Sequence, residues 1–184
     1  MNRHIFAAFL VLALSFSACN QDDRTHAMIE TEFGNMKIVL YDETPVHRDN
    51  FTKLAREGFY DGTLFHRIIK GFMIQGGDPE SKTAEAGQQL GGGGTGYTLD
   101  PEIGSPHIKG TLAAARLGDH VNPAKKSSGC QFFIVQGSPQ SDAQLDFFEK
   151  QKNIKYNETQ RRLYKEKGGY PSLDMEYTVF GEVV

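Results

Sequence analysis

The chain has 184 residues, with 20 Lys and Arg against 23 Asp and Glu, and a formal net charge of −3. This length suits one domain with a sizeable core, and a slightly negative charge without a basic stripe argues against nucleic acid as a partner. The sequence has 20 glycines, 13 phenylalanines and no tryptophan, which favours a mainly β protein with an aromatic interior.

The first 18 residues predict a targeting segment. An apolar run at 5–14, too short to span a bilayer, is followed by small residues. The segment from Phe16 to Cys19 resembles the lipobox of bacterial lipoproteins, which implies cleavage before Cys19 and lipidation of that residue. An ordinary secretory signal with a chance cysteine is the alternative. Residues 19–26 are polar and predict a tether, so we expect a lipid-anchored protein of the bacterial cell envelope, on its periplasmic or surface face.

Two strands are predicted next, at 28–33 and 36–41, with a turn at Gly34 and Asn35. Their apolar face is expected to consist of Ile29, Phe33, Ile38 and Leu40.

A helix is predicted to begin at Thr44 and Pro45, because threonine can cap a helix and proline suits its first position. Apolar residues then recur at helical spacing, namely Phe51, Leu54 and Ala55, and Gly58 ends the helix. We expect His47 and Asp49 on this helix to be solvated.

The stretch 63–78 predicts a hairpin with its turn at Lys70 and Gly71, since both halves are rich in aromatic and branched residues. If Leu64 and Ile68 point into a core, strand alternation places Arg67 on the opposite face. In the second strand Met73 and Gln75 share a face. A guanidinium, an amide and apolar groups then line one patch; the alternative is a buried hairpin with one arginine at its edge.

His66 lies within this hairpin, and we interpret it as a satisfied structural group, because no second ligand at metal spacing accompanies it. The following stretch, 79–96, is a polar loop in which Gly91, Gly93 and Gly96 formally match G-x-G-x-x-G. No strand leads into this motif and no helix start follows it, so we predict a surface loop and not a nucleotide site.

Two further strands are predicted at 111–115 and 130–135. The small side chains of the first indicate close packing or room for a ligand. Cys130 is expected to behave as a small buried apolar group, since no paired base supports a nucleophile.

A helical insertion on the surface is predicted at about 138–172. Ser141 and Asp142 begin one helix with Leu145 and Phe148, and Asn157 with Gln160 forms a capping box before a second. The positive charge at 150–155 indicates either a partner contact or a solvated cap.

Three motifs in this order resemble the signature of the cyclophilins, the peptidyl-prolyl isomerases: Phe65-His66-Arg67, the segment from Phe72 to Gly77, and Gln131-Phe132-Phe133. The resemblance begins near Met28 and is interrupted by the insertion at 140–171. It implies a cyclophilin-like closed antiparallel β-barrel with a capping helix and one isomerase domain at 27–184. The chain ends at Val184, before the second helix and last strand usual in the family, so we expect an open sheet edge.

The resemblance also assigns a site, a substrate class and a monomeric state, with no metal or cofactor. Arg67, Gln75 and Phe72 are implied as catalytic, and proline-containing polypeptides as substrates. The implied substrate-binding residues are Phe72, Met73, Gln75, Ala115, Arg116, Gln131, Phe133, Leu173 and Tyr177. Of these, Phe72, Met73, Phe133 and Leu173 are implied to form a proline pocket with Tyr177 at its edge. Gln75 and the backbone of Ala115 are implied to hold the peptide, and Gln131 to orient the site; ordinary core packing is the alternative.

The sequence therefore predicts an isomerase that assists the folding of exported proteins, with Arg67 as the hydrogen-bond donor to the prolyl amide. The rival hypothesis is a chaperone or binding module that holds proline-containing segments in the same groove without catalysis. A hydrolase is disfavoured, because no pattern of nucleophile and base is present.

Overall fold

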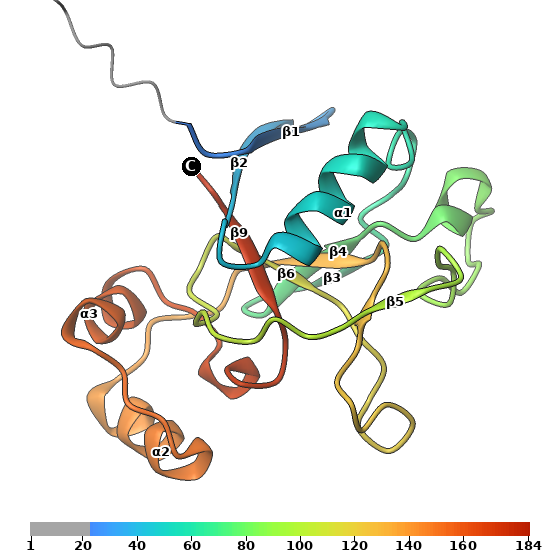
Figure 1. Ribbon diagram of the computed structural model, residues 1–184. Coiled ribbons are helices and arrows are strands. Elements are labelled where there is room, and N and C mark those ends of the chain that lie inside the picture. The colour runs from blue at the N-terminus through green and yellow to red at the C-terminus, as the bar shows by residue number, and fades with distance from the viewer. Residues whose placement is uncertain (1–22) are drawn as a thin grey trace, which may run out of the picture.

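The computed structural model describes residues 23–184, so the predicted signal, Cys19 and most of the tether lie outside the described residues. An antiparallel sheet with the strand order β1-β2-β9-β6-β8-β4-β3 forms the centre of the molecule (Figure 1). Its strands are β1 (His26–Thr31), β2 (Gly34–Leu40), β3 (Arg67–Ile69), β4 (Met73–Gly76), β6 (Thr111–Ala114), β8 (Phe132–Val135) and β9 (Val179–Val183). A second sheet pairs β5 (Thr98–Leu99) with β7 (Ser127–Ser128).

The helices are few, in agreement with the mainly β class predicted. They are α1 (Pro45–Arg56), α2 (Asp142–Lys152) and α3 (Glu158–Glu166), with the 3₁₀ helices η1 (Pro79–Thr83) and η2 (Pro171–Leu173). Helix α1 lies over the sheet, whereas α2 and α3 stand together to one side of it (Figure 1). No helix within residues 23–184 is long and apolar enough to cross a membrane.

The sheet curls into a half-barrel whose edge strands are β1 and β3, so the barrel that the resemblance implied is not closed within residues 23–184. The expected open edge is therefore present in the described part of the chain. A groove of about 1040 Å³ opens along it, lined by the β1–β2 hairpin, α1 and the β3–β4 hairpin.

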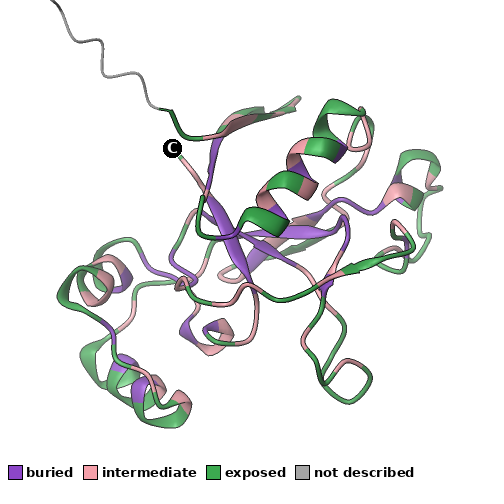
Figure 2. Ribbon diagram, viewed as in Figure 1, coloured by how far each residue is buried: buried purple, intermediate pink, exposed green. Residues whose placement is uncertain are grey.

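Two apolar clusters cover the two faces of the sheet, and β8 contributes to both by strict alternation. Phe132 and Ile134 pack toward α1 with Ile38, Leu40, Phe51, Leu112, Ala114 and Phe180, which together form the helix-side cluster. Phe133 and Val135 pack on the other face with Met73, Ala113 and Val179, which form the site-side cluster. The buried stretches meet in the central strands of the sheet (Figure 2).

The first hairpin forms as predicted, but its turn lies earlier in the chain. Thr31 pairs with Gly34, so the turn consists of Glu32 and Phe33 rather than Gly34 and Asn35. Phe33 is consequently 93% exposed, and its assignment to the apolar face is wrong. The other three residues of that face are buried or packed against the helix-side cluster.

Helix α1 is confirmed, but its cap comes from a distant residue. Thr44 makes no capping bond; instead the carboxylate of Glu102 accepts from the backbone N–H groups of Val46 (3.1 Å) and His47 (3.0 Å). The negative carboxylate also suits the positive end of the helix dipole. The sequence could not reveal this, because 56 residues separate Val46 from Glu102.

His47 is 2% exposed, so the prediction that it is solvated is wrong. Its Nδ1 lies 2.6 Å from Glu102 Oε2, and its Nε2 lies 2.9 Å from Ser127 Oγ. Burial lowers the pKa of His47, although Glu102 acts in the opposite direction. Asp49, in contrast, is exposed and pairs with Arg48, as expected of a solvated residue.

The central hairpin has the predicted turn and places Arg67 directly opposite Gln75. The assumption that Leu64 and Ile68 point into a core is wrong, since these side chains are 51% and 69% exposed. They line the open groove at the sheet edge instead of entering a closed core.

The helical insertion is confirmed, with the predicted capping box at Asn157 and Gln160 and a second capping box at Ser141 and Gln144, where only a helix start was predicted. It lies at the surface but is not detached from the domain. Ile108 of the main domain joins Leu145, Tyr156 and Tyr164 of the insertion in a third apolar cluster.

Candidate active site

Arg67 lies on the exposed edge strand β3, with its guanidinium at the border of the site-side cluster. Its Nη1 donates to Gln75 Oε1 at 3.1 Å, across the strand pair. The guanidinium carbon is 5.8 Å from the centroid of the Phe72 ring. The structure thus holds a permanent positive charge beside a half-buried aromatic ring, with guanidinium donors that have no partner among residues 23–184.

Gln75, the hydrogen-bond partner of Arg67, is held in turn by a second amide side chain, that of Gln131. Gln75 Nε2 donates to Gln131 Oε1 at 3.0 Å, and Gln131 Nε2 donates to the carbonyls of Gly91 (3.0 Å) and Gly93 (2.7 Å). Gln131 is 6% exposed, so these bonds replace water almost completely. Gln131 thus holds the Gln75 amide in place, and its role in orienting a substrate site stays a prediction.

The glycine-rich loop is tied down by a second residue, Asp78. Its buried carboxylate accepts from the backbone N–H groups of Glu80 (2.8 Å), Gly91 (2.5 Å) and Gly93 (3.3 Å). A Cβ atom at position 93 would lie 2.1 Å from Asp78 Oδ1, which explains why glycine is needed there. The loop contains no helix after its glycines, in agreement with the surface-loop interpretation.

The residues of the predicted proline pocket, together with Ala115, come from four segments of the chain. Met73 and Phe133 are buried in the site-side cluster, while Phe72, Ala115, Leu173 and Tyr177 pack against it and remain partly exposed. The Tyr177 ring meets Phe133 edge to face, with centroids 5.7 Å apart. None of these residues lines the groove at the sheet edge. The structure thus presents a second apolar surface, which borders Arg67 through Phe72.

Arg116 is turned toward the wall of this surface. Its Nε donates to the Glu176 carbonyl at 2.7 Å, and its guanidinium carbon lies 4.6 Å from the Tyr177 ring centroid. An ion pair of 2.6 Å with Asp119 occupies another nitrogen. Arg116 therefore supports Tyr177, and its direct contact with a peptide stays a prediction.

Three residues beside the site gave no signal in the sequence. The Tyr170 ring lies 4.5 Å from that of Phe72. His107 is fully buried, with its ring nearly parallel to Phe133 at 6.1 Å, and its Nδ1 lies 2.9 Å from Asp174 Oδ1. His107 and Asp174 are 67 residues apart, so no local pattern links them.

Two residues interpreted as structural behave differently from each other. Cys130 is 3% exposed and burial raises the pKa of its thiol, in agreement with an inert apolar role. His66 is not satisfied as expected, because neither ring nitrogen has a hydrogen-bond partner among residues 23–184. The same residues contain no group of three His, Cys, Asp or Glu side chains arranged to hold a metal ion.

Comparison with known proteins identifies the family to which this architecture corresponds. Residues 26–184 match the family model described as cyclophilin type peptidyl-prolyl cis-trans isomerase/CLD. A peptidyl-prolyl cis-trans isomerase of Synechococcus elongatus is 42% identical over 112 residues, which cover 60% of this chain and 68% of that protein. A Staphylococcus haemolyticus protein named for the same activity is 32% identical over 165 residues, with 89% and 77% covered.

A Streptococcus pyogenes protein, whose name combines a phosphatase with a peptidyl-prolyl cis-trans isomerase, is 39% identical over 161 residues. The match covers 85% of this chain but 31% of that protein, so the chain spans about a third of this relative. Among solved structures, a cyclophilin type peptidyl-prolyl cis-trans isomerase of Cryptosporidium parvum has a TM-score of 0.55 and 28% identity, with 85% and 75% covered. The same protein in the presence of the dipeptide Ala-Pro gives a TM-score of 0.56 at 27% identity, with 87% and 78% covered.

Proposed function

Since the chain belongs to the family of cyclophilin-type peptidyl-prolyl cis-trans isomerases, we propose that it accelerates rotation about X-Pro bonds through Arg67. The observation on which this depends is the position of the Arg67 guanidinium, bonded to Gln75 and set over the rim of the apolar surface at Phe72. The presence of an Ala-Pro dipeptide with the similar Cryptosporidium protein supports a proline-containing ligand.

Rotation about an X-Pro bond breaks amide resonance, and the barrier is about 18–20 kcal/mol. No proton leaves and no covalent bond forms. In the twisted state the prolyl nitrogen becomes pyramidal and accepts a hydrogen bond, so a fixed donor stabilises this state more than the planar ground state. A guanidinium is permanently charged and offers five donors, of which Gln75 takes one.

The charge of Arg67 and the apolar pocket contribute different parts of the expected decrease in the rotational barrier. Lowering the barrier by about 5 kcal/mol accelerates rotation by roughly three to four powers of ten. A charge-assisted donor aimed at the transition state supplies about 3–4 kcal/mol of this. Desolvation of the proline ring against Phe72, Met73, Phe133 and Leu173, with the peptide held by Gln75 and the backbone of Ala115, supplies the remainder.

An uncoupled proline-peptide assay tests this proposal with the substitution Arg67→Ala. We expect kcat/KM to fall by about two to three powers of ten. The matched control is Arg56→Ala, an exposed arginine at the end of α1, which should retain the full rate. An Arg67→Ala variant with full activity refutes the mechanism. Wild-type protein that binds the peptide without accelerating its isomerisation would instead support the binding module or chaperone.

The site of action is a second part of the proposal. The lipobox-like segment that ends at Cys19 supports a lipid-anchored protein of the bacterial envelope, which acts on exported polypeptides as they fold. Fractionation of cells expressing Cys19→Ser tests this point. The variant should be absent from the membrane fraction. A variant that remains in the membrane fraction with the same mass as the wild-type protein would contradict lipidation.

A further inference from the structure

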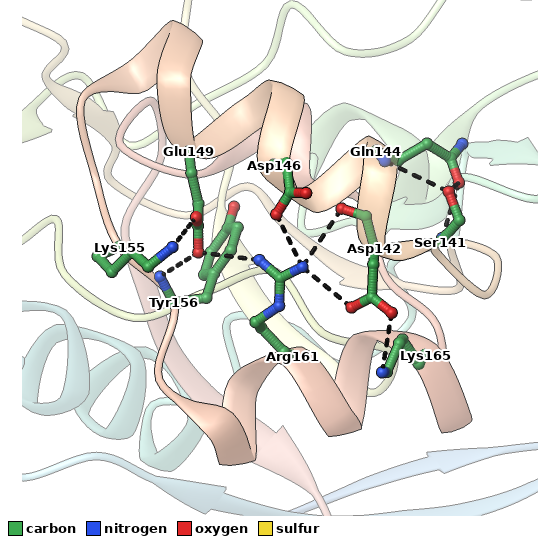
Figure 3. A network of polar contacts seen from close by, with 9 residues as sticks. All are labelled: Ser141, Asp142, Gln144, Asp146, Glu149, Lys155, Tyr156, Arg161 and Lys165. Atoms are coloured by element: carbon green, nitrogen blue, oxygen red, sulfur yellow. Dashed lines mark hydrogen bonds and ion pairs between the residues drawn. The ribbon is translucent and has the colours of Figure 1, made fainter.

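One arginine joins the two helices of the α2–α3 insertion (Figure 3). Arg161 on α3 pairs with Asp142 and Asp146, each at 2.9 Å, and with Glu149 at 3.2 Å, all on α2. Lys165 adds a contact of 3.2 Å to Asp142. Such a network holds two short helices in one relative position, even where single exposed ion pairs contribute little.

Two tyrosines of this unit donate to one carboxylate of the main domain. The hydroxyls of Tyr156 and Tyr164 lie 2.5 Å and 2.6 Å from Asp174 Oδ2. The other oxygen, Oδ1, accepts from the backbone N–H of His107 at 2.7 Å and lies 2.9 Å from His107 Nδ1. Asp174 is 3% exposed, so these four contacts replace its hydration.

The hydroxyls remain donors at neutral pH. Burial, followed by the charge of Asp174, raises the pKa of both Tyr156 and Tyr164. Both phenols thus keep their protons at neutral pH and can donate to Asp174.

Asp174 belongs to the segment that forms the far wall of the candidate site, between Leu173 and Tyr177. The next residue, Met175, has a φ of +63°, a backbone conformation that residues other than glycine rarely adopt. Glu176 is bound on the other side of this turn by Lys152 of α2 at 3.2 Å and by Lys125 at 2.6 Å. The strained turn is therefore held by contacts on both sides. Tyr164 of α3 takes part on the side of Asp174, and Lys152 of α2 takes part on the side of Glu176.

Asp174 is also connected, through His107, to the residues beneath the apolar surface. His107, held by Asp174, lies 6.1 Å from Phe133 in a nearly parallel arrangement and 6.2 Å from the Tyr177 ring at 82°. Displacement of Asp174 would consequently disturb both the wall and the floor of the predicted proline pocket.

We propose that the insertion is a brace that fixes Leu173 and Tyr177 for proline binding, with Tyr156 and Tyr164 as its positioning residues. The inference rests on the isomerase function proposed above. Loss of the two hydroxyls frees the segment 173–177, so binding must then order the wall, which weakens affinity for the substrate. Arg67 and Gln75 are not touched by this change, so the effect falls on KM and not on kcat.

The test is the double variant Tyr156→Phe/Tyr164→Phe, which removes both hydroxyls and keeps both rings. We expect KM for a proline peptide to rise by about five- to tenfold while kcat stays within about twofold. The matched control is Tyr60→Phe, whose hydroxyl donates to the Cys130 carbonyl at 3.3 Å and whose ring packs on the helix-side cluster. The control should leave KM unchanged, and an unchanged KM in the double variant overturns the brace.

Lys152→Met provides a second variant should the double variant fold poorly. It removes only the contact of α2 with Glu176, and we expect KM to rise about twofold. Chemical shifts of the Leu173 methyl groups and the Tyr177 ring should move in both insertion variants and not in Tyr60→Phe. Shifts that stay in place refute the inference.

Failure of the brace is distinguishable from failure of the proposed function. An active wild type that requires Arg67, together with insertion variants of normal KM, overturns only the brace. A wild type without isomerase activity overturns the proposed function, and the Kd for the proline peptide in the same variants then decides whether the insertion shapes a binding site.

Discussion

The two walls of the candidate site are built in different ways. On one side, Arg67, Gln75 and Gln131 are joined by side-chain amides across neighbouring strands, and Arg67 is open to water. On the other side, Leu173 and Tyr177 are positioned by a buried carboxylate, Asp174, whose partners come from the insertion and from the loop before β6. In the proposed function the first wall donates hydrogen bonds to the substrate, whereas the second supplies shape.

This difference predicts where each wall is sensitive. Removal of a group from the amide wall should reduce catalysis with a modest loss of stability. Removal of the buried carboxylate should destabilise the fold first, because its donors are left without acceptors in a region that excludes water.

The largest effect is expected for Asp174→Asn. An amide has one acceptor oxygen where the carboxylate has two, so either the His107 donors or the two tyrosine hydroxyls lose their buried acceptor. The free energy of unfolding should fall by about 3 kcal/mol, as measured by urea denaturation. A loss below about 0.5 kcal/mol would show that the two walls do not differ in this way.

A smaller effect, on catalysis, is expected for Gln131→Met, which keeps the side-chain length but removes its hydrogen bonds to Gln75, Gly91 and Gly93. The Gln75 amide then loses its orientation, and kcat/KM should fall about tenfold because Arg67 is held less firmly. Thermal unfolding provides the comparison with Asp174→Asn. A larger loss of stability in Gln131→Met than in Asp174→Asn would reverse the assignment of the two walls.

The smallest effect concerns pH and belongs to neither wall. The pKa of buried His47 is lowered in the folded protein, so below the ordinary value of about 6.5 the unfolded chain binds a proton that the folded chain does not. Stability should therefore decrease as the pH falls from about 6.5, with a slope of at most about 1.4 kcal/mol per pH unit for this one group. Urea denaturation between pH 7 and pH 5 measures the slope.

His47→Gln provides the control, because it cannot take up the proton and should remove this part of the slope. The isomerase activity of the folded fraction should not follow the same curve, since His47 lies on the opposite side of the sheet from Arg67. An activity profile that tracked His47 would show that the helix-side cluster and the site are coupled.

Several elements could be predicted from local patterns alone. The helix start at Ser141 and the capping box at Asn157 identified both insertion helices, and the turn at Lys70 and Gly71 fixed the hairpin that presents Arg67. These features depend on residues a few positions apart, so the sequence states them directly. The motifs that resemble cyclophilins led to the family, which the comparisons confirm.

The errors arose where a side chain found its partner far along the chain or met an open surface. Thr44 was the local candidate for a cap, but Glu102 occupies that position. Leu64 and Ile68 alternate as core residues do, yet they face a groove at the edge of the half-barrel. Alternation specifies which residues share a face, and it does not say what covers that face.

The sequence by itself determined the family, the mainly antiparallel strands and the two insertion helices, because each depends on short-range spacing or a contiguous motif. Only the tertiary structure decided that His107, Tyr156 and Tyr164 converge on Asp174, and that Glu102 caps α1. The physical reason is that a buried charge must collect its donors from whatever segments the fold brings beside it. Those segments are separated along the chain by distances that no local pattern encodes.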